Sequence, residues 1–284
     1  MASTTKMATK MSIKAATKSA RAGSKPGSGS SVPVSVLVGG QDGARKEWRL
    51  AEEVPVNLAY NGRPHVVMMA TPEDLEDFAV GFSLSEGVLA SADIVRDIKV
   101  EHVKGGIMVD VATASRAEVV RERQARSLEG RSGCGLCGMQ RLDQVVRNVQ
   151  PVHAGFEIST DAIAAAFESL PEHQTMNRLN HSVHAAAWAD AEGKILLIRE
   201  DVGRHNALDK LIGALSRDGI DTTKGFCVMT SRCSFELVQK SAAVGIPYLA
   251  TVSAPTALAL DLAERAGMIL ASLSPDGVVL FEAG

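Results

Sequence analysis

The chain has 284 residues, which is enough for one large domain or for two lobes that share a core. Hydrophobic residues make up 45% of it, as in ordinary globular proteins, and no apolar run approaches the roughly 18 residues of a membrane-spanning helix. The N-terminus lacks the apolar stretch of a secretory signal, so we expect neither a membrane protein nor an exported one.

Charge is unevenly spread along the chain. Residues 1–31 contain six basic residues and no acidic one, so the total of -3 leaves about -9 (-3 minus +6) for the remainder. An acidic body argues against a nucleic-acid-binding protein, which would present a basic face. The basic tail is poor in apolar residues, and we predict that residues 1–31 are disordered. An organellar transit peptide, also acid-poor and rich in Ser, is the alternative.

Residues 32–150 are predicted to form an N-terminal lobe with a hairpin, a helix and a cysteine loop. A β-branched run predicts a strand over 32–38, at a sheet edge because Pro33 cannot donate to a ladder. Strands over 54–60 and 65–70 are joined by Asn61-Gly62, a strong hairpin signal. A helix is then expected up to about residue 85, with Thr71 as its N-cap and Pro72 at its first position.

Two cysteines, Cys134 and Cys137, lie in the glycine-flanked loop Ser-Gly-Cys-Gly-Leu-Cys-Gly at 132–138. Three glycines leave both sulfurs unshielded, and a nearby Arg126 or Arg131 would lower the pKa of a thiolate there. With no export signal, we expect a reduced, cytoplasmic protein in which this pair is reactive rather than structural. A reachable thiolate of this kind suits a persulfide carrier.

Other chemistries of a cysteine pair can be weighed on the sequence. A zinc site would need two more ligands, and Cys227 and Cys233 are poorly spaced for one, so no bound metal is expected. A thioredoxin-like redox pair should lie next to a βαβ pattern, and a dinucleotide loop should follow a strand. Zinc deamination is excluded, because no histidine has Glu two residues later and Gly133 replaces the Pro of that motif.

Residues 151–284 have the rhythm of an α/β lobe. Strands are predicted over 194–199, 226–230 and 247–252, each followed by a helix, over 206–215, 235–244 and 256–266. Three such units in succession predict a largely parallel sheet, covered by helices.

Polar loops follow each of these strands. They contain Arg204 and His205, Ser231 and Arg232, and Ser253. In parallel sheets ligands bind at the carboxyl ends of the strands, where helix N-termini hold anions. Any one of these loops could be a simple helix cap, but together they favour a site for a phosphate-bearing ligand.

Several long motifs that follow one another along the chain together resemble the FdhD family of formate dehydrogenase accessory sulfurtransferases. The resemblance covers about residues 47–270, and its strongest parts are the cysteine loop at 132–138, DVGRHNALDK at 201–210, TSR at 230–232 with ELV at 236–238, and SAPT at 253–256. The chain departs from the family pattern where Asn180-His181-Ser182 stands in place of Thr-Gly-Gly, and at 273–278, where the usual Arg is missing.

The resemblance implies a fold like that of cytidine deaminases, with a layered α/β lobe and a smaller β-rich N-terminal part. It implies that Cys134 receives persulfide sulfur from a cysteine desulfurase, with Cys137 assisting. The sulfur would pass to a bis-guanine-dinucleotide molybdenum cofactor destined for formate dehydrogenase. That cofactor would contact the sheet edge and, at the C-terminal family stretch, Gly277. A homodimer is compatible with the resemblance.

Two other functions stay open on the sequence. The first is a chaperone that binds and delivers the molybdenum cofactor without transferring sulfur. The second is a structural module in which zinc stabilises the cysteine pair.

Overall fold

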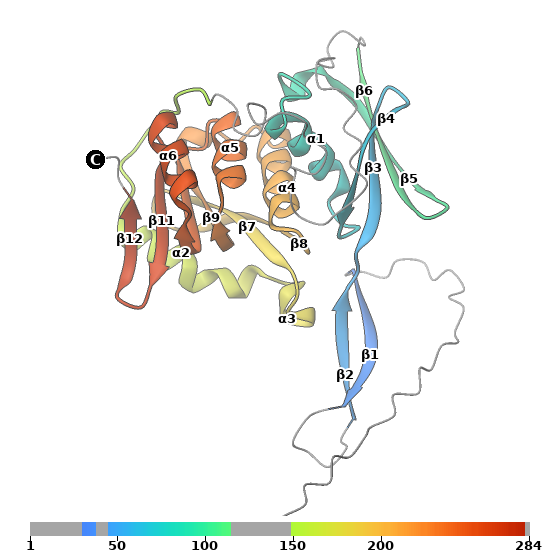
Figure 1. The fold of residues 1–284 in the computed structure, drawn as a ribbon, viewed down its shortest axis with the longest axis horizontal. Helices are drawn as coiled ribbons and strands as arrows, with labels where there is room; N and C mark the ends of the chain where they lie inside the picture. The colour runs from blue at the N-terminus through green and yellow to red at the C-terminus, as the bar shows by residue number, and fades with distance from the viewer. Residues whose placement is uncertain (1–29, 38–44, 115–148, 282–284) are drawn as a thin grey trace, which may run out of the picture.

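The computed structural model describes residues 30–37, 45–114 and 149–281 (Figure 1). The basic tail up to residue 29 and the loop with Cys134 and Cys137 lie outside the described residues. The described chain forms a two-stranded ribbon, a four-stranded sheet and a six-stranded sheet. None of its helices is long and apolar enough to cross a membrane.

The N-terminal elements are a ribbon and a hairpin. Strands β1 (Ser31–Leu37) and β2 (Arg45–Ala51) pair antiparallel, so the predicted first strand lies in a ribbon in which both strands are edges. Strands β3 (Val54–Tyr60) and β4 (Arg63–Ala70) form the predicted hairpin. Asn61 and Gly62 both have positive φ at its turn, as a two-residue hairpin turn requires.

The four-stranded sheet has the order β4-β3-β6-β5 and is completed by β5 (Val95–Val103) and β6 (Gly106–Thr113). One face carries alternating buried residues such as Leu58 and Val109, which pack against Phe78 and Phe82 of α1 (Leu75–Ser85). The short helix η1 (Ala92–Ile94) leads into β5.

The start of α1 differs from the prediction. The helix begins at Leu75 rather than Pro72, and the predicted cap Thr71 is buried instead. The backbone N–H of Thr71 donates to the carboxylate of Asp201, and its hydroxyl accepts from the backbone N–H of Val202. The Thr71 hydroxyl, which was expected to cap the helix, therefore binds the backbone of the distant Val202 instead.

The C-terminal half confirms all three predicted strand–helix units. They are β8 (Ile195–Asp201) with α4 (Arg204–Arg217), β9 (Gly225–Cys233) with α5 (Phe235–Ala243), and β10 (Tyr248–Pro255) with α6 (Ala257–Ala266). The remaining elements are α2 (Thr160–His173), α3 (Asn177–Asn180), β7 (His184–Asp190), η3 (Thr222–Lys224), β11 (Ile269–Ser274) and β12 (Gly277–Phe281).

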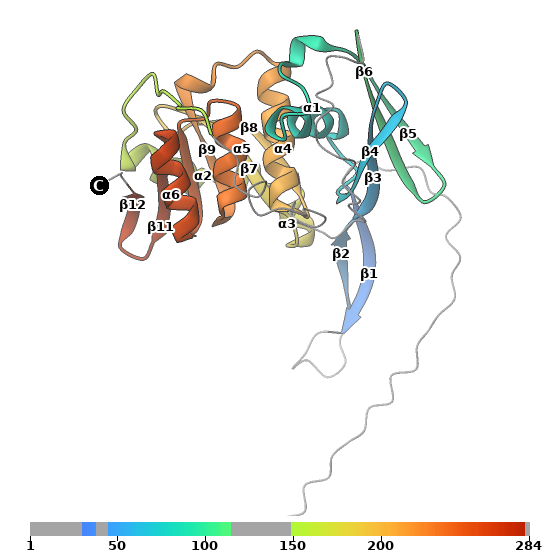
Figure 2. The same cartoon turned by 45° about the horizontal axis from the view of Figure 1, so that its top comes forward.

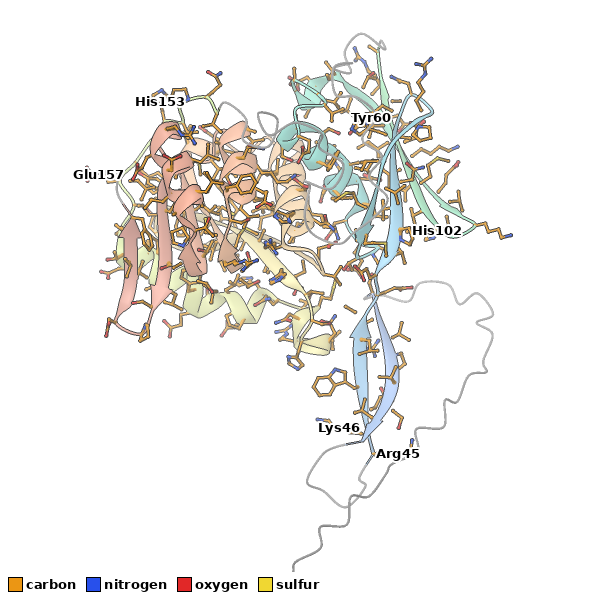
Figure 3. The ribbon with its side chains drawn as sticks, viewed as in Figure 1. Arg45, Lys46, Tyr60, His102, His153 and Glu157 are labelled. Carbon is orange, nitrogen blue, oxygen red and sulfur yellow. The ribbon has the colours of Figure 1, made fainter. Side chains whose placement is uncertain are left out.

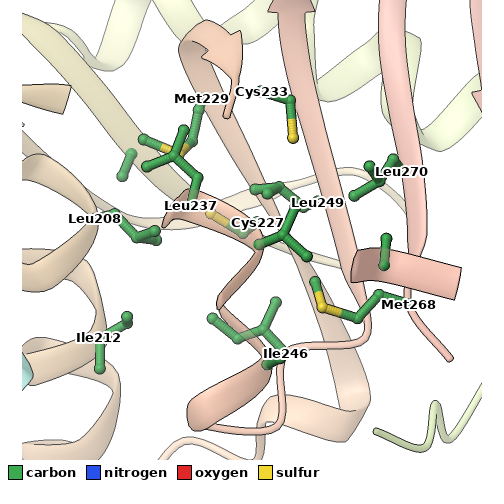
Figure 4. Packing of buried hydrophobic residues seen from close by; sticks show 14 of the residues in the cluster. Leu208, Ile212, Cys227, Met229, Cys233, Leu237, Ile246, Leu249, Met268 and Leu270 are labelled. Carbon is green, nitrogen blue, oxygen red and sulfur yellow. The ribbon is translucent and has the colours of Figure 1, made fainter. Parts of the chain in front are cut away.

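Helices cover both faces of the six-stranded sheet. Helices α4, α5 and α6 lie side by side over one face, and α2 lies on the other (Figures 1 and 2). Successive residues of a strand point to opposite faces of the sheet, so each strand contributes side chains to both apolar layers. In β7, Trp188 packs on the side of the three helices, while Ala187 and Ala189 pack on the side of α2. Figure 4 shows the larger layer, in which Leu208, Leu237 and Leu249 meet from different elements.

The expectation of a largely parallel sheet is only partly met, because the six-stranded sheet is mixed. Strands β9, β10 and β11 are parallel neighbours, but β7 is antiparallel to both β8 and β9, and β12 is antiparallel to β11. The connections explain the antiparallel pairs, because a short turn can join only antiparallel neighbours. One tight turn, which contains Gly193, joins β7 to β8, and another joins β11 to β12.

Helices α1 and α4 meet at two glycines and thereby join the two sheets. A Cβ on Gly81 would lie 1.7 Å from the carbonyl oxygen of Asp209, and one on Gly213 would lie 1.9 Å from that of Asp77. Only glycine allows the two helix backbones to approach this closely.

A buried ion pair lies beside this helix contact. The ammonium of Lys240, from α5, lies 2.8 Å from both carboxylate oxygens of Asp209, 3.0 Å from the Ser85 hydroxyl and 3.0 Å from the Glu86 carboxylate. Burial raises the pKa of Asp209, while the neighbouring carboxylates raise that of Lys240 against the effect of burial. Three helices are thus fixed to one another by a single desolvated charge cluster.

We predict that Gly81→Ala lowers the free energy of unfolding by about 3 kcal/mol or more, because the new Cβ meets a backbone oxygen that cannot move away alone. Chemical denaturation followed by circular dichroism measures this. Ala165→Gly on the exposed face of α2 is the control, with an expected cost of about 1 kcal/mol from helix propensity. Equal losses in the two variants would contradict the close helix contact.

A strained residue ends α3. His181 has φ of 53°, in the left-handed region, and its ring lies 5.6 Å from that of Trp48 on β2. We predict that His181→Gly raises the free energy of unfolding by about 1 kcal/mol, because glycine adopts this conformation without strain. His181→Ala keeps the strain and should bring no gain. If His181→Ala raised the free energy of unfolding, or if His181→Gly lowered it, the change would come from loss of the His181–Trp48 contact and not from relief of backbone strain.

Candidate functional site

The predicted polar loops do meet at one edge of the six-stranded sheet. Strands β8, β9, β10 and β11 point in the same direction, so their carboxyl ends share an edge. Ser253 lies opposite Arg232 in the strand register, and the backbone N–H of Thr256 donates to the carbonyl of Cys233 at 3.1 Å. Gly277, in the β11–β12 turn with φ of 117°, lies at the outer end of the same edge.

One carboxylate organises the inner end of this edge. Asp201, fully buried at the end of β8, accepts from the backbone of Gly203 at 2.8 Å and from the Asn206 amide at 3.0 Å. It also pairs with the buried Lys210 ammonium at 2.8 Å and accepts from the backbone of Thr71 at 2.9 Å. The loop between β8 and α4 is therefore fixed to its own helix and to the N-terminal sheet.

Arg204 and His205 form the first turn of α4, whose N-cap, Gly203, has no side chain to cap the helix. The side chain of His205 is buried, with 4% of the residue exposed, and neither of its ring nitrogens has a hydrogen-bond partner among the described residues. The Nε of Arg204 is also buried without a partner there. A helix N-terminus with buried, unused donors has the features of an anion site.

Glu236, in the first turn of α5, stands beside this histidine. Its carboxylate lies 3.8 Å from Nε2 of His205, which is an ion-pair distance rather than a hydrogen bond. Burial opposes ionisation of Glu236, but the neighbouring His205 outweighs it and lowers the pKa of the carboxyl to about 2. Glu236 is therefore negatively charged at neutral pH.

His184 adds a second imidazole to the edge. It starts β7, lies opposite Asp201 in the register and is half-buried. Burial lowers its pKa, and the nearby Arg204 and His205 lower it further. Glu236 belongs to the ELV motif at 236–238, but no role was assigned to it or to His184 from the sequence.

The other predicted residues of the edge differ in exposure. Ser231 is buried and its hydroxyl donates to the carbonyl of Arg232, while the side chains of Arg232 and Ser253 are exposed. The edge thus combines a buried donor set around α4 with exposed polar groups on the neighbouring loops.

Thiol chemistry is not available at the described cysteines. Cys227 and Cys233 are both buried, and burial raises the pKa of each thiol, for Cys233 to about 12. Neither is a thiolate at neutral pH. Within residues 30–37, 45–114 and 149–281 no group of three His, Cys, Asp or Glu side chains is arranged to hold a metal ion.

Comparison with known proteins agrees with the resemblance seen in the motifs. The model of the FdhD/NarQ family matches residues 51–278. The chain is 50% identical over 227 residues to a protein of Xanthomonas euvesicatoria named sulfur carrier protein FdhD, covering 80% of this chain and 81% of the relative. A protein of the same name from Cupriavidus necator is 53% identical over 222 residues, covering 78% and 77%.

A solved structure is also similar. It is described as a putative formate dehydrogenase accessory protein from Desulfotalea psychrophila, with a TM-score of 0.71 and 25% identity over 89% of this chain and 98% of that one. The family match, the relatives and the shared fold lead to one conclusion: the chain belongs to the FdhD/NarQ family.

Proposed function

We propose that this protein is a cytoplasmic sulfur carrier. It accepts persulfide sulfur from a cysteine desulfurase and passes it to a bis-guanine-dinucleotide molybdenum cofactor for formate dehydrogenase. The relatives named sulfur carrier proteins and the accessory-protein neighbour support this role. The observation that carries it is the state of the cysteines. Because Cys227 and Cys233 are buried with raised pKa, thiolate chemistry is left to Cys134 and Cys137.

The chemistry balances with two cysteines. The Cys134 thiolate attacks the outer sulfur of the donor persulfide, the donor S–S bond breaks, and the donor leaves as a thiolate. Attack of the Cys137 thiolate on the inner sulfur of the new persulfide then releases the outer sulfur as sulfide to the cofactor. This leaves a disulfide between Cys134 and Cys137, which a cellular dithiol reduces.

The cofactor is the substrate of this transfer and would lie along the sheet edge. Its phosphates suit the start of α4, with the donors of Arg204 and His205, and the polar groups of Ser231, Arg232 and Ser253 extend the same edge. Gly277 is included because it has no side chain and nothing lies within 4 Å of where a Cβ would stand, so a ligand could approach its backbone. The proposal also includes a fold like that of cytidine deaminases and a homodimeric state.

We predict that incubation with a cysteine desulfurase and cysteine adds the mass of one sulfur atom at Cys134. Mass spectrometry of peptides detects it. Cys134→Ala should abolish the gain, whereas the control Cys227→Ala, which alters a buried thiol, should keep it. An unchanged mass at Cys134 and Cys137 in the wild type would overturn the proposal.

The competing function of a delivery chaperone makes a different prediction in cells. If the protein only binds the cofactor, Cys134→Ala leaves formate dehydrogenase active. If it transfers sulfur, the same variant leaves the dehydrogenase inactive with an under-sulfurated metal. Stoichiometric zinc in the purified protein, lost in Cys137→Ser, would instead favour a structural module.

A further inference from the structure

The ribbon of β1 and β2 has one apolar face. Residues that lie directly opposite each other on paired strands share a face of the sheet. On one face of the ribbon these residues are Val32, Val34, Val36, Lys46, Trp48 and Leu50. The ammonium of Lys46 lies 5.9 Å from the centre of the Trp48 ring, so its aliphatic stem belongs to the same apolar surface. Because an isolated two-stranded ribbon is at best marginally stable in water, this face requires a cover.

The neighbours of the ribbon cover only part of this face. Apart from each other, the two strands have α3 as their main neighbour among the described residues, and the ring of His181 reaches that of Trp48. Trp48 is still 36% exposed and Leu50 is 48% exposed, and Leu179 of α3 is 47% exposed. Large apolar side chains that remain exposed together mark an interaction surface.

Hydrogen bonds hold the root of the ribbon, where its strands join the rest of the protein. The backbone N–H and the hydroxyl of Ser30 donate to the Glu73 carboxylate at 2.6 and 3.0 Å, and the backbone N–H of Glu52 donates to the carbonyl of Ser30 at 2.7 Å. Arg49 donates to the hydroxyl and the carbonyl oxygen of Ser31. The ribbon therefore projects from the protein in a fixed direction (Figure 1), and so does its apolar face.

Charge is divided along the length of the ribbon. Two basic residues, Arg45 and Lys46, lie at its tip, the end remote from the larger sheets (Figure 3), and the acid Glu47 follows them. The root has three acidic residues and one basic residue, which are Glu52, Glu53, Glu73 and Arg49. The tip is thus net positive and the root net negative. These opposite charges can meet only if a second ribbon lies alongside the first in the opposite direction.

We propose that a second copy of this chain covers the ribbon: the two ribbons pack by their apolar faces about a two-fold axis, with the basic tip of each at the acidic root of the other. The axis passes close to the middle residue pair, Val34 and Trp48, and brings the two copies of Trp48 together. Two-fold symmetry makes each favourable charge pair occur twice. The inference rests on the proposed function, since it names the surface of the homodimer included there.

Sedimentation velocity of the full-length chain over a range of concentrations measures the dissociation constant of the dimer. Leu50→Lys should raise that constant about tenfold or more, because it places a charge inside the apolar contact of both copies. Leu50 is exposed in a single copy, so the variant keeps its fold, which circular dichroism checks.

A charge exchange tests the direction of the two ribbons. Lys46→Glu and Glu53→Lys each turn two attractive pairs into repulsive ones, so each should raise the dissociation constant about tenfold at low salt. The double variant restores opposite charges and should return the constant to within about threefold of the wild type. The control Lys194→Glu, which changes an exposed lysine in the turn after β7, at the end of that strand remote from α3, should leave the constant unchanged.

Three results would overturn the proposal: a wild type that stays monomeric, a dimer that Leu50→Lys leaves unchanged, and a double charge variant as weak as the single ones. In a monomer, acrylamide quenching of Trp48 fluorescence tells a face covered by the same chain from one open to a different protein. Sulfur uptake at Cys134 is measured in the same proteins. If a monomeric wild type gains one sulfur atom, the interface fails and the sulfur-carrier function stands; if a dimeric wild type gains none, the sulfur-carrier function fails and the interface stands.

Discussion

The close contact between α1 and α4 is the constraint on which the rest of the structure depends. Gly81 and Gly213 let two helix backbones touch, so the four-stranded sheet carried by α1 is held against the six-stranded sheet carried by α4. Apolar packing alone would tolerate a shift along the helices. The Lys240–Asp209 pair fixes the register, because a shift would leave a charge buried without its partner.

The same joint determines the geometry of the sheet edge. Asp201 lies one turn before α4 and receives hydrogen bonds both from its own loop and from Thr71 of the N-terminal part. Lys210, which pairs with Asp201, also donates to the carbonyl of Thr71. The direction in which α4 begins, and with it the position of His205, is therefore set by residues about 130 positions earlier in the chain.

Local signals account for what could be predicted. The Asn61-Gly62 turn and the three strand–helix units rest on turn chemistry and on short apolar runs, which act within a few residues. Strand β7 is rich in alanine, which has no strand preference, so its place between β8 and β9 comes from tertiary packing. Thr71 looked like a cap because its tertiary partner is far away in sequence. The edge residues could be predicted as a group, but the pairing of His205 with Glu236 depends on how α4 and α5 pack.

The sheet edge carries Arg204 and Arg232 in a chain with a net charge of -3. The charge of Asp201 is compensated by the buried Lys210, so it does not cancel the field of Arg204 next to it. Long-range attraction, screened within about 10 Å at moderate salt, contributes little to drawing an anion toward an acidic body. Recognition of an anion therefore depends on short-range hydrogen-bond donors that are already desolvated and oriented. The buried Nε–H of Arg204, which has no hydrogen-bond partner among the described residues, is such a donor.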